Sequence, residues 1–417
     1  TTISAGTLQL GNGGTTGAIL GDVANNGALT FNRSDVQTFP GLISGSGAVN
    51  QIGTGTTILT ANNTYTGGTT ISAGTLQLGN GGASGTILGD VANNGALTFN
   101  RSDVLTFPGL ISGSGAVNQI GTGTTILTAD NTYTGGTTIS AGGLQLGNGG
   151  TSGSILGNVA NDGLLAFNRS DTMTLAGQIS GSGAVNQMGS GTTVLTGANS
   201  YTGGTTIAAG TLQLGDGGAS GSIVGDVANN GALAFNRSDV QTFPGLISGS
   251  GTVNQIGTGT TILTANNTYT GGTTISAGTL QLGNGGTTGA ILGDVTNNGA
   301  LTFNRSDVQT FPGLVSGSGV VNQIGAGTTI LTADNTYTGG TTISAGTLQL
   351  GNGGTTGAIL GNVANNGALT FNRSDVQTFP GQISGGGVVN QIGTGTTILT
   401  ANNTYTGGTT ISAGTLQ

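Results

Sequence analysis

The chain has 417 residues, of which 88 are glycine, 5% are charged and 4% are aromatic. A chain of this length ordinarily forms two or three globular domains, but so few large side chains cannot fill thick cores. Apolar residues still make up 34% and occur as short runs of Ile, Leu and Val, unlike the composition of disordered proteins. The composition therefore favours an ordered fold with a thin interior.

Several residue types are missing, and their absence excludes whole classes of chemistry. The sequence contains no Cys, Trp, His, Lys or Glu, so disulfides, thiolate or imidazole metal sites and Ser/His/Asp catalysis are excluded. We expect no cofactor, no metal site and no enzymatic activity. The net charge of −8, from 14 Asp against 6 Arg, argues against a nucleic-acid partner. No apolar run approaches the ~18–20 residues of a membrane span, so we expect no membrane span in this segment.

A long tandem repeat of constant period organises the sequence. The string TTISAGTLQ begins at Thr1, Thr69, Thr273, Thr341 and Thr409, and close variants begin at Thr137 and Thr205. The repeats therefore cover residues 1–68, 69–136, 137–204, 205–272, 273–340 and 341–408, with a partial seventh at 409–417. No insertion or deletion interrupts them. A constant period predicts stacked units rather than units on flexible linkers.

Taken in chain order, the first repeat reads as short strands and tight corners. Aliphatic or aromatic residues alternate with Thr, Gln or Asn in runs of three to six, which is the period of a strand. Glycine-rich segments separate these runs and supply the conformations that tight corners need. They are residues 11–14, 25–27, 44–47 and 53–55. No segment has helical spacing, so the prediction is an all-β chain.

A weaker sub-repeat predicts how the strands are arranged. Gly6, Gly27 and Gly47 each open a Gly–small–aliphatic segment, and the next such segment opens at Gly74. These intervals suit the coils of a parallel β-solenoid, with about three coils in each repeat. We therefore expect residues 1–417 to form one continuous solenoid, a rod whose coils hydrogen-bond to one another along the axis.

Alternation and the differences among repeats predict which side chains face inward. The inward set is Leu8, Leu10, Val23, Leu29, Phe31, Val49 and Ile58, together with Leu20, Ile43 and Ile52. Gln37, which becomes Leu105 and Met173 in later repeats, is expected on the outside or in a loop, as is Leu42. The third repeat departs most, because it has Leu175 and Ala176 where the others have Phe and Pro.

The segment 45–81 resembles the autotransporter-associated β-strand repeat of type V secretion passenger domains. Its pattern of Asn-x-Tyr-x-Gly-Gly-Thr-x-Ile followed by Gly-x-Leu is matched at Asn63, Tyr65, Gly67, Gly68, Thr69, Ile71, Gly74 and Leu76. The family's Lys is replaced by Gln51. The resemblance covers a little over half of each repeat. It implies a right-handed parallel β-helix displayed outside a Gram-negative cell, commonly as a stalk or adhesin.

The only recurring ionisable pair is an Arg followed two residues later by an Asp. Because residues i and i+2 of a strand lie on one face, we expect a small exposed ion pair in each repeat. The alternative is a stripe of Arg along the solenoid that contacts carboxylates or sulfated glycans. The candidate residues are Arg33, Asp35, Arg101, Asp103, Arg169, Asp171, Arg237, Asp239, Arg305, Asp307, Arg373 and Asp375. No unit gathers the clustered carboxylates that a glycan-cleaving β-helix needs.

Two functions remain. The first is a structural or adhesive rod or fibre segment on a bacterial cell surface, and the second is a glycan-binding or glycan-active β-helix that uses the Arg and Asp pairs. The uniform repeats favour the first. The expected partners are further copies of the chain, end to end or side by side, and host or matrix glycans or proteins. Since TTISAGTLQ stands at both ends, we expect the chain to be a window on a longer fibre.

Overall fold

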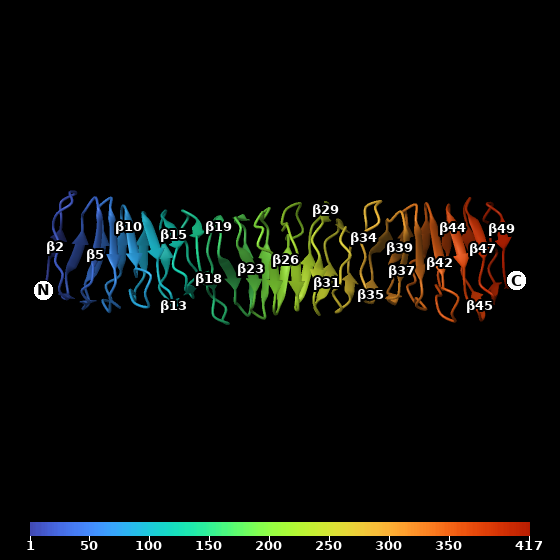
Figure 1. Cartoon of the computed structure of the whole chain (residues 1–417), viewed down its shortest axis with the longest axis horizontal. Helices are drawn as coiled ribbons and strands as arrows, with labels where there is room; N and C mark the ends of the chain where they lie inside the picture. Colours follow the sequence, from blue (N-terminus) through green and yellow to red (C-terminus); the bar gives the residue numbers. More distant parts are fainter. The chain divides into compact units, whose positions relative to one another are not determined.

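The structure, a computed structural model, describes residues 1–417 and consists of strands, turns and bends without a helix. The chain divides into two compact units, residues 1–211 and 212–417. Strands pair in parallel in both units. Within the first unit, coloured blue to green, successive turns of the chain stack in sequence order (Figure 1). The predicted fold class is confirmed: the chain is an all-β parallel β-solenoid.

The strands of the first unit are grouped here by sheet. A three-stranded sheet contains β1 (Thr2–Ile3), β3 (Val23–Asn25) and β6 (Ile43–Ser44). A six-stranded sheet contains β2 (Thr7–Leu10), β4 (Ala28–Phe31), β7 (Ala48–Gln51), β9 (Thr69–Ile71), β11 (Val91–Asn93) and β14 (Ile111–Ser112). An eight-stranded sheet contains β5 (Val36–Phe39), β8 (Thr56–Leu59), β10 (Thr75–Leu78), β12 (Ala96–Phe99), β15 (Ala116–Gln119), β17 (Thr137–Ile139), β19 (Val159–Asn161) and β22 (Ile179–Ser180). A further sheet pairs β13 (Val104–Phe107), β16 (Thr124–Leu127), β18 (Gly143–Leu146), β20 (Leu164–Phe167), β23 (Ala184–Gln187) and β25 (Thr205–Ile207), and β21 (Thr172–Leu175) pairs with β24 (Thr192–Leu195).

The second unit repeats the same strand types. Strand β26 (Thr211–Leu214) contains the residues at which the two units divide. The strands that follow are β27 (Val227–Asn229), β28 (Ala232–Phe235), β29 (Val240–Phe243), β30 (Ile247–Ser248), β31 (Thr252–Gln255), β32 (Thr260–Leu263), β33 (Thr273–Ile275), β34 (Thr279–Leu282), β35 (Val295–Asn297), β36 (Ala300–Phe303), β37 (Val308–Phe311), β38 (Val315–Ser316), β39 (Val320–Gln323), β40 (Thr328–Leu331), β41 (Thr341–Ile343), β42 (Thr347–Leu350), β43 (Val363–Asn365), β44 (Ala368–Phe371), β45 (Val376–Phe379), β46 (Ile383–Ser384), β47 (Val388–Gln391), β48 (Thr396–Leu399), β49 (Thr409–Ile411) and β50 (Thr415–Leu416).

The length of one turn follows from the register of the eight-stranded sheet. Seven consecutive pairings lead from Gln37 in β5 to Ile179 in β22, and each pairing joins one turn to the next. One turn therefore takes roughly 20 residues, and one repeat makes about three and a third turns. The expectation of about three coils per repeat is confirmed.

The extra third of a turn moves each new repeat to another side of the solenoid. A strand of the type Val-x-Thr-Phe lies at the edge of its sheet and is the earliest strand of that sheet in the sequence. Its first two copies, β5 and β13, belong to different sheets. The eight-stranded sheet that begins with β5 thus passes through all eight strand types of the repeat in turn. The continuity of the solenoid between residues 211 and 212 stays a prediction.

A thin apolar interior holds the turns together, as the composition predicts. Phe39, Leu59, Leu78 and Phe99 follow one another in register along the eight-stranded sheet and are fully buried. Phe39 also contacts Phe31 edge to face, with ring centroids 5.6 Å apart. The third repeat lacks this aromatic contact, because Leu175 takes the place of the second Phe.

The structure corrects several predicted side-chain directions. Leu10, Val23, Leu29, Phe31 and Val49 are buried as expected, and so is Ile43. Leu8 is only half-buried, although its counterpart Leu76 is fully buried. Leu20 and Ile52 were expected in the interior but are 74% and 38% exposed.

Two residues of the β5 and β8 pair also differ from the prediction. Gln37 is 6% exposed, so it lies in the interior and not outside. Ile58 is buried, but it pairs with the exposed Thr38, whereas Thr57 and Leu59 pair with the buried Gln37 and Phe39. Alternation therefore places Ile58 on the outer side of the sheet.

Candidate functional site

Each Arg of the candidate pairs stands at a corner, directly after a strand of the type Ala-Leu-Thr-Phe. Arg33 comes two residues after the end of β4, and residues 32–35 form the turn into β5. The prediction that Arg and Asp share one strand face is therefore wrong. The corner nevertheless brings the two side chains together in every repeat.

The contact between them has the same bidentate geometry in all six repeats. Nε of the Arg donates to Oδ1 of the Asp at 2.8–2.9 Å. Nη2 donates to Oδ2 at 2.6–2.8 Å. Two parallel charge-assisted hydrogen bonds fix the orientation of the planar guanidinium.

The pairs are only partly exposed, because the Arg of each pair is largely buried, contrary to the sequence-based expectation. The Arg side chains are 7–13% exposed, whereas the Asp side chains are 34–38% exposed. A guanidinium can be buried to this degree only when its charge and its N–H groups are matched by acceptors. The remaining acceptors come from earlier turns of the solenoid.

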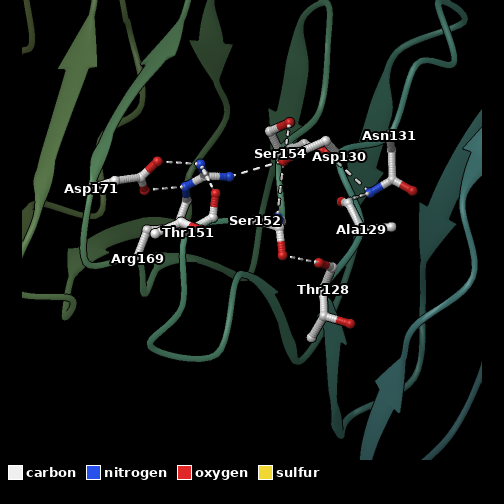
Figure 2. Close-up of polar contacts among 10 residues, drawn as sticks. Thr128, Ala129, Asp130, Asn131, Thr151, Ser152, Ser154, Arg169 and Asp171 are labelled. Atoms are coloured by element: carbon white, nitrogen blue, oxygen red, sulfur yellow. Dashed lines mark hydrogen bonds and ion pairs between the residues drawn. The ribbon is translucent and has the colours of Figure 1, made fainter.

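Arg169 shows the complete arrangement (Figure 2). Besides its bond to Asp171, its Nη1 donates to Oδ1 of Asp130 at 2.9 Å, and its Nη2 donates to the carbonyl oxygen of Thr151. Asp130 lies 39 residues earlier, which is two turns back, and Thr151 lies in the loop of the turn between them. One guanidinium therefore joins three consecutive turns.

The same connections recur in the other repeats with different acceptors. Arg373 contacts Oδ1 of Asp334 at 3.0 Å, and Arg305 contacts Oδ1 of Asn266 at 3.1 Å. Arg101 reaches Oδ1 of Asn62 at 3.4 Å and the carbonyl oxygen of Ala83 at 2.7 Å. Arg33 and Arg237 donate to the loop carbonyl oxygens of Gly17 and Gly221, at 3.4 and 3.1 Å.

The loop under each Arg is held to the preceding turn by side chains as well. Oδ1 of Asp130 accepts hydrogen bonds from the Gly153 amide at 3.0 Å and from the Ser154 hydroxyl at 2.9 Å. The Ser152 hydroxyl donates to the carbonyl oxygen of Thr128 at 2.8 Å, as Figure 2 also shows. Asp130 thus holds in place both the loop that contains Gly153 and Ser154 and the guanidinium of Arg169.

The electrostatics follow from this geometry. The hydrogen bonds from Arg169 lower the pKa of Asp171, and the hydrogen bonds from Arg33 do the same for the pKa of Asp35. In return, the hydrogen bonds to Asp171 and, less strongly, to Asp130 raise the pKa of Arg169. Each pair is therefore charged on both sides across the physiological range.

The six pairs do not form the row that a ligand-binding stripe requires. In the first unit, Arg33, Arg101 and Arg169 follow β4, β12 and β20, which belong to three different sheets. In the second unit, Arg237, Arg305 and Arg373 follow β28, β36 and β44, which also belong to three sheets. A ligand carboxylate at any Arg would also have to displace an Asp that is already bound. Contact of the twelve residues with a ligand stays a prediction.

Sequence reasoning missed a second set of buried polar residues, in which the Tyr makes a contact within one turn and the Asn joins turns. The Tyr65 hydroxyl lies 2.7 Å from Oγ1 of Thr69 in the interior, and the spacing Tyr-x-Gly-Gly-Thr is the signal for this contact. Asn63 accepts a hydrogen bond from the Ile43 amide and donates to the carbonyl oxygens of Ala61 and Thr86. The residues that carry the family resemblance thus hold the fold together.

The structure has no pocket and no group of three or more Asp side chains close enough to hold a metal ion. It also contains no helix with the length and apolar character needed to cross a bilayer.

The fold and its corners define a class of protein, a parallel β-solenoid whose repeats are joined by buried polar side chains. The Passenger-associated-transport-repeat family matches six segments of the chain, residues 49–78, 117–146, 185–214, 253–282, 321–350 and 389–417. Each segment contains the Asn, Tyr, Gly-Gly-Thr and Ile positions that carried the sequence resemblance. These six segments of the β-solenoid therefore match passenger-associated transport repeats, and together they make up less than half of the chain.

Part of the chain is also similar to an autotransporter adhesin. The chain is 34% identical over 202 residues to the "Adhesin BmaC autotransporter" of Brucella suis biovar 1 (strain 1330). The match covers 43% of this chain and 6% of that much longer protein. No solved structure matches the chain.

Proposed function

We propose that the chain is a structural and adhesive segment of an autotransporter passenger on the surface of a Gram-negative cell. The observation that carries the proposal is how its polar side chains are used. In every repeat the Arg binds other parts of the chain and holds turns together. In the first five repeats a buried Asn does the same, and a buried Tyr contacts the Thr four residues later. What remains exposed is a repeated, weakly acidic surface of Gly, Asn, Ser, Thr, single Asp and isolated aliphatic side chains. Such an array serves as a spaced scaffold with many equal contact points.

Surface display is tested on the bacterium that encodes the chain. Antibodies raised against the purified chain are expected to label intact cells, and external protease is expected to remove the label. Cells lacking the gene are the control. Labelling that appears only after the envelope is permeabilised contradicts surface display.

Adhesion is tested with the purified chain. Beads coated with the chain are expected to bind immobilised matrix proteins or matrix glycans more strongly than beads coated with a solenoid of unrelated sequence. Because each contact is weak and repeated, binding is expected to fall steeply when the chain is shortened to three repeats. Equal binding by both kinds of bead contradicts an adhesive role.

Self-association side by side is the second kind of contact that we propose. Val36, Val104, Val240, Val308 and Val376 open equivalent strands and are 65–67% exposed. The third repeat has Thr172 at this position, so the fold accepts Thr there. Changing all five Val to Thr is expected to reduce association measured by light scattering at high concentration while leaving the circular dichroism spectrum unchanged. Unchanged association would show that these five Val side chains do not lie in the interface.

We also infer that this segment is not an enzyme. Each of its Arg is engaged with an Asp, and it lacks the Lys, His, Glu and Cys of many hydrolase and lyase sites. The expected result is no release of reducing or unsaturated ends from pectin, alginate or glycosaminoglycan. Release that exceeds the heat-inactivated control overturns the inference.

A further inference from the structure

The ten Asn-Gly dipeptides of the chain fall into two groups with different surroundings. Five stand at corners between strands of the types Val-Ala-Asn and Ala-Leu-Thr-Phe, with Asn at 26, 94, 230, 298 and 366. The other five stand in the exposed Asn-Gly-Gly loops, with Asn at 12, 80, 148, 284 and 352. Asn-Gly is the dipeptide in which an Asn side chain is chemically least stable, because Gly leaves the next amide nitrogen unhindered.

The corner group is held rigidly. Oδ1 of Asn94 accepts hydrogen bonds from the amide and hydroxyl of Ser114 in the next turn, at 3.1 and 3.2 Å. A Cβ on Gly95 would lie 2.5 Å from the carbonyl oxygen of Gly74 in the preceding turn. The side chain and the backbone are therefore both fixed between neighbouring turns.

The loop group has open surroundings. Asn80 is exposed, its side chain makes no hydrogen bond, and no atom lies within 4 Å of the Cβ position of Gly81 or Gly82. The one restraint at the dipeptide is the amide of Gly81, which donates to the carbonyl oxygen of Asn100 at 2.8 Å. Breaking this one hydrogen bond in a surface loop frees the Gly81 nitrogen and the Asn80 side chain to react. At a corner, the same freedom requires stacked strands to separate.

We propose that the five Asn-Gly-Gly loops are sites of spontaneous deamidation in the folded protein. The Gly81 nitrogen loses its proton and attacks Cγ of Asn80, and the side-chain nitrogen leaves as ammonia, which closes a five-membered succinimide. Water then adds to one of the two ring carbonyls and opens the ring to aspartate or isoaspartate. Each event consumes one water, releases one ammonia and replaces a neutral amide with a carboxylate.

The fold accepts the product. The fourth repeat has Asp216 at the loop position of Asn80, and Oδ1 of Asp216 accepts a hydrogen bond from the Gly218 amide at 3.3 Å. Five conversions would add five negative charges to the formal charge of −8. The modification therefore makes the exposed loops progressively more anionic while the buried contacts of the solenoid stay intact.

The experiment compares the two groups within one molecule. The folded chain is incubated at about pH 8.5 and 37 °C, cleaved after its Arg residues, and each Asn is followed by fragment mass spectrometry as a gain of about one dalton. The fragment 34–101 contains both Asn80 and Asn94, and four of the five loop sites have a corner control in their own peptide in this way. The exception is Asn148, whose fragment has Asp162 at the corner. We expect the loop Asn to convert at least ten times faster than the corner Asn.

Two controls make the result decisive. In denaturant, all ten sites are expected to convert at similar rates, because the structure that separates them is gone. The variant Asn80→Gln is expected to abolish conversion at that loop only. Similar rates at loop and corner sites in the folded chain overturn the proposal, and so does a folded chain in which no loop site converts while the denatured chain converts at all ten.

Discussion

Single polar side chains in the interior decide how well one turn is held to the next. Most of them are matched, but the Gln at the position of Gln37 is not. Both polar atoms of the Gln37 amide group are buried without a partner, and Oε1 of Gln309 is in the same state. Leu105 and Met173 occupy this position in the second and third repeats and are 8% and 6% exposed. An apolar side chain thus suits the site better than the Gln that four repeats carry.

The first prediction follows from this mismatch. The change Gln309→Leu is expected to raise the free energy of unfolding by ~1 kcal/mol, because it removes a buried amide oxygen that has no hydrogen-bond partner, without leaving a cavity. Chemical denaturation of the purified chain measures the change. The reverse substitution Leu105→Gln is the matched control and is expected to destabilise the chain. A destabilised Gln309→Leu variant contradicts this account of the site.

The Arg and Asp pairs predict a loss of stability in acid. The carboxyl pKa of Asp35 and of Asp171 is lower in the folded chain than the usual ~3.9 of the unfolded chain. Their contribution is therefore fully present above about pH 4 and is lost as the pH falls through the lowered folded pKa. The thermal midpoint is expected to be level between pH 5 and 7 and to fall below pH 4.

The variant Arg169→Met tests the origin of this acid sensitivity. It removes the partner of both Asp171 and Asp130, so its midpoint is expected to be lower at pH 7 and to fall less between pH 5 and 2 than that of the unchanged chain. Parallel pH profiles for the two proteins would show that other groups cause the acid transition.

The buried tyrosines predict a second, alkaline transition. Burial raises the pKa of Tyr65, Tyr133, Tyr201, Tyr269 and Tyr337 above the usual ~10. Their stabilising effect is present below about pH 10 and is lost as the pH rises towards the raised values. In an absorbance titration at 295 nm these five phenols are expected to ionise only as the chain unfolds. Ionisation of all of them near pH 10 in a chain with native circular dichroism contradicts their burial.

At the scale of the structural element, the corners limit how closely turns can approach. Gly123 directly precedes β16. A Cβ on Gly123 would lie 2.0 Å from the carbonyl oxygen of Asp103 in the preceding turn. Its φ is not positive, so the requirement for Gly arises from the neighbouring backbone and not from its own conformation. The loop residue Gly82 also has no positive φ, but open space surrounds it.

The substitution Gly123→Ala is therefore expected to cost ~2 kcal/mol or more, because backbone atoms of the preceding turn would have to move. Gly82→Ala is the matched control and is expected to change stability by less than ~0.5 kcal/mol. Denaturation midpoints of the two variants measure the difference. Equal midpoints would mean that the turns can separate at this corner without loss.

At the scale of the whole chain, the repeat is the unit that can be removed. Deleting residues 69–136 joins Gly68 to Thr137, which restores the local sequence found between Gly136 and Thr137. All strand pairings of the repeat are re-formed, and the later repeats shift by about a third of a turn. Circular dichroism per residue is expected to stay unchanged, while the total stability falls by the contribution of one repeat.

Deleting residues 103–136 is the control for this prediction. It removes half a repeat and pairs strand types that never meet in the unchanged chain, so the buried rows no longer continue. We expect lower strand content and aggregation. If both deletions fold equally well, the pairing of strand types is not what specifies the solenoid.

The sequence by itself determined the strand types, their order and the period of the repeat, because alternation and glycine corners are local properties. It also indicated the similarity to passenger-associated transport repeats, through the Asn63 and Tyr65 motif. It did not determine which side chains face the interior, as Gln37, Leu20 and Ile52 show. Alternation places neighbouring residues on opposite faces of a strand, but it does not say which face the rest of the chain buries.

Only the tertiary structure decided the length of a turn and the role of the Arg residues. Turns differ in length according to how each corner packs: Thr57 pairs with Leu76 in a short turn, and Thr137 pairs with Val159 in a longer one. The turns of one repeat add up to about three and a third, and the extra third of a turn places successive Arg residues on different sheets. It is also the stacking of turns that brings Arg169 to Asp130, 39 residues away, since hydrogen bonds between turns set this distance and no local pattern records it.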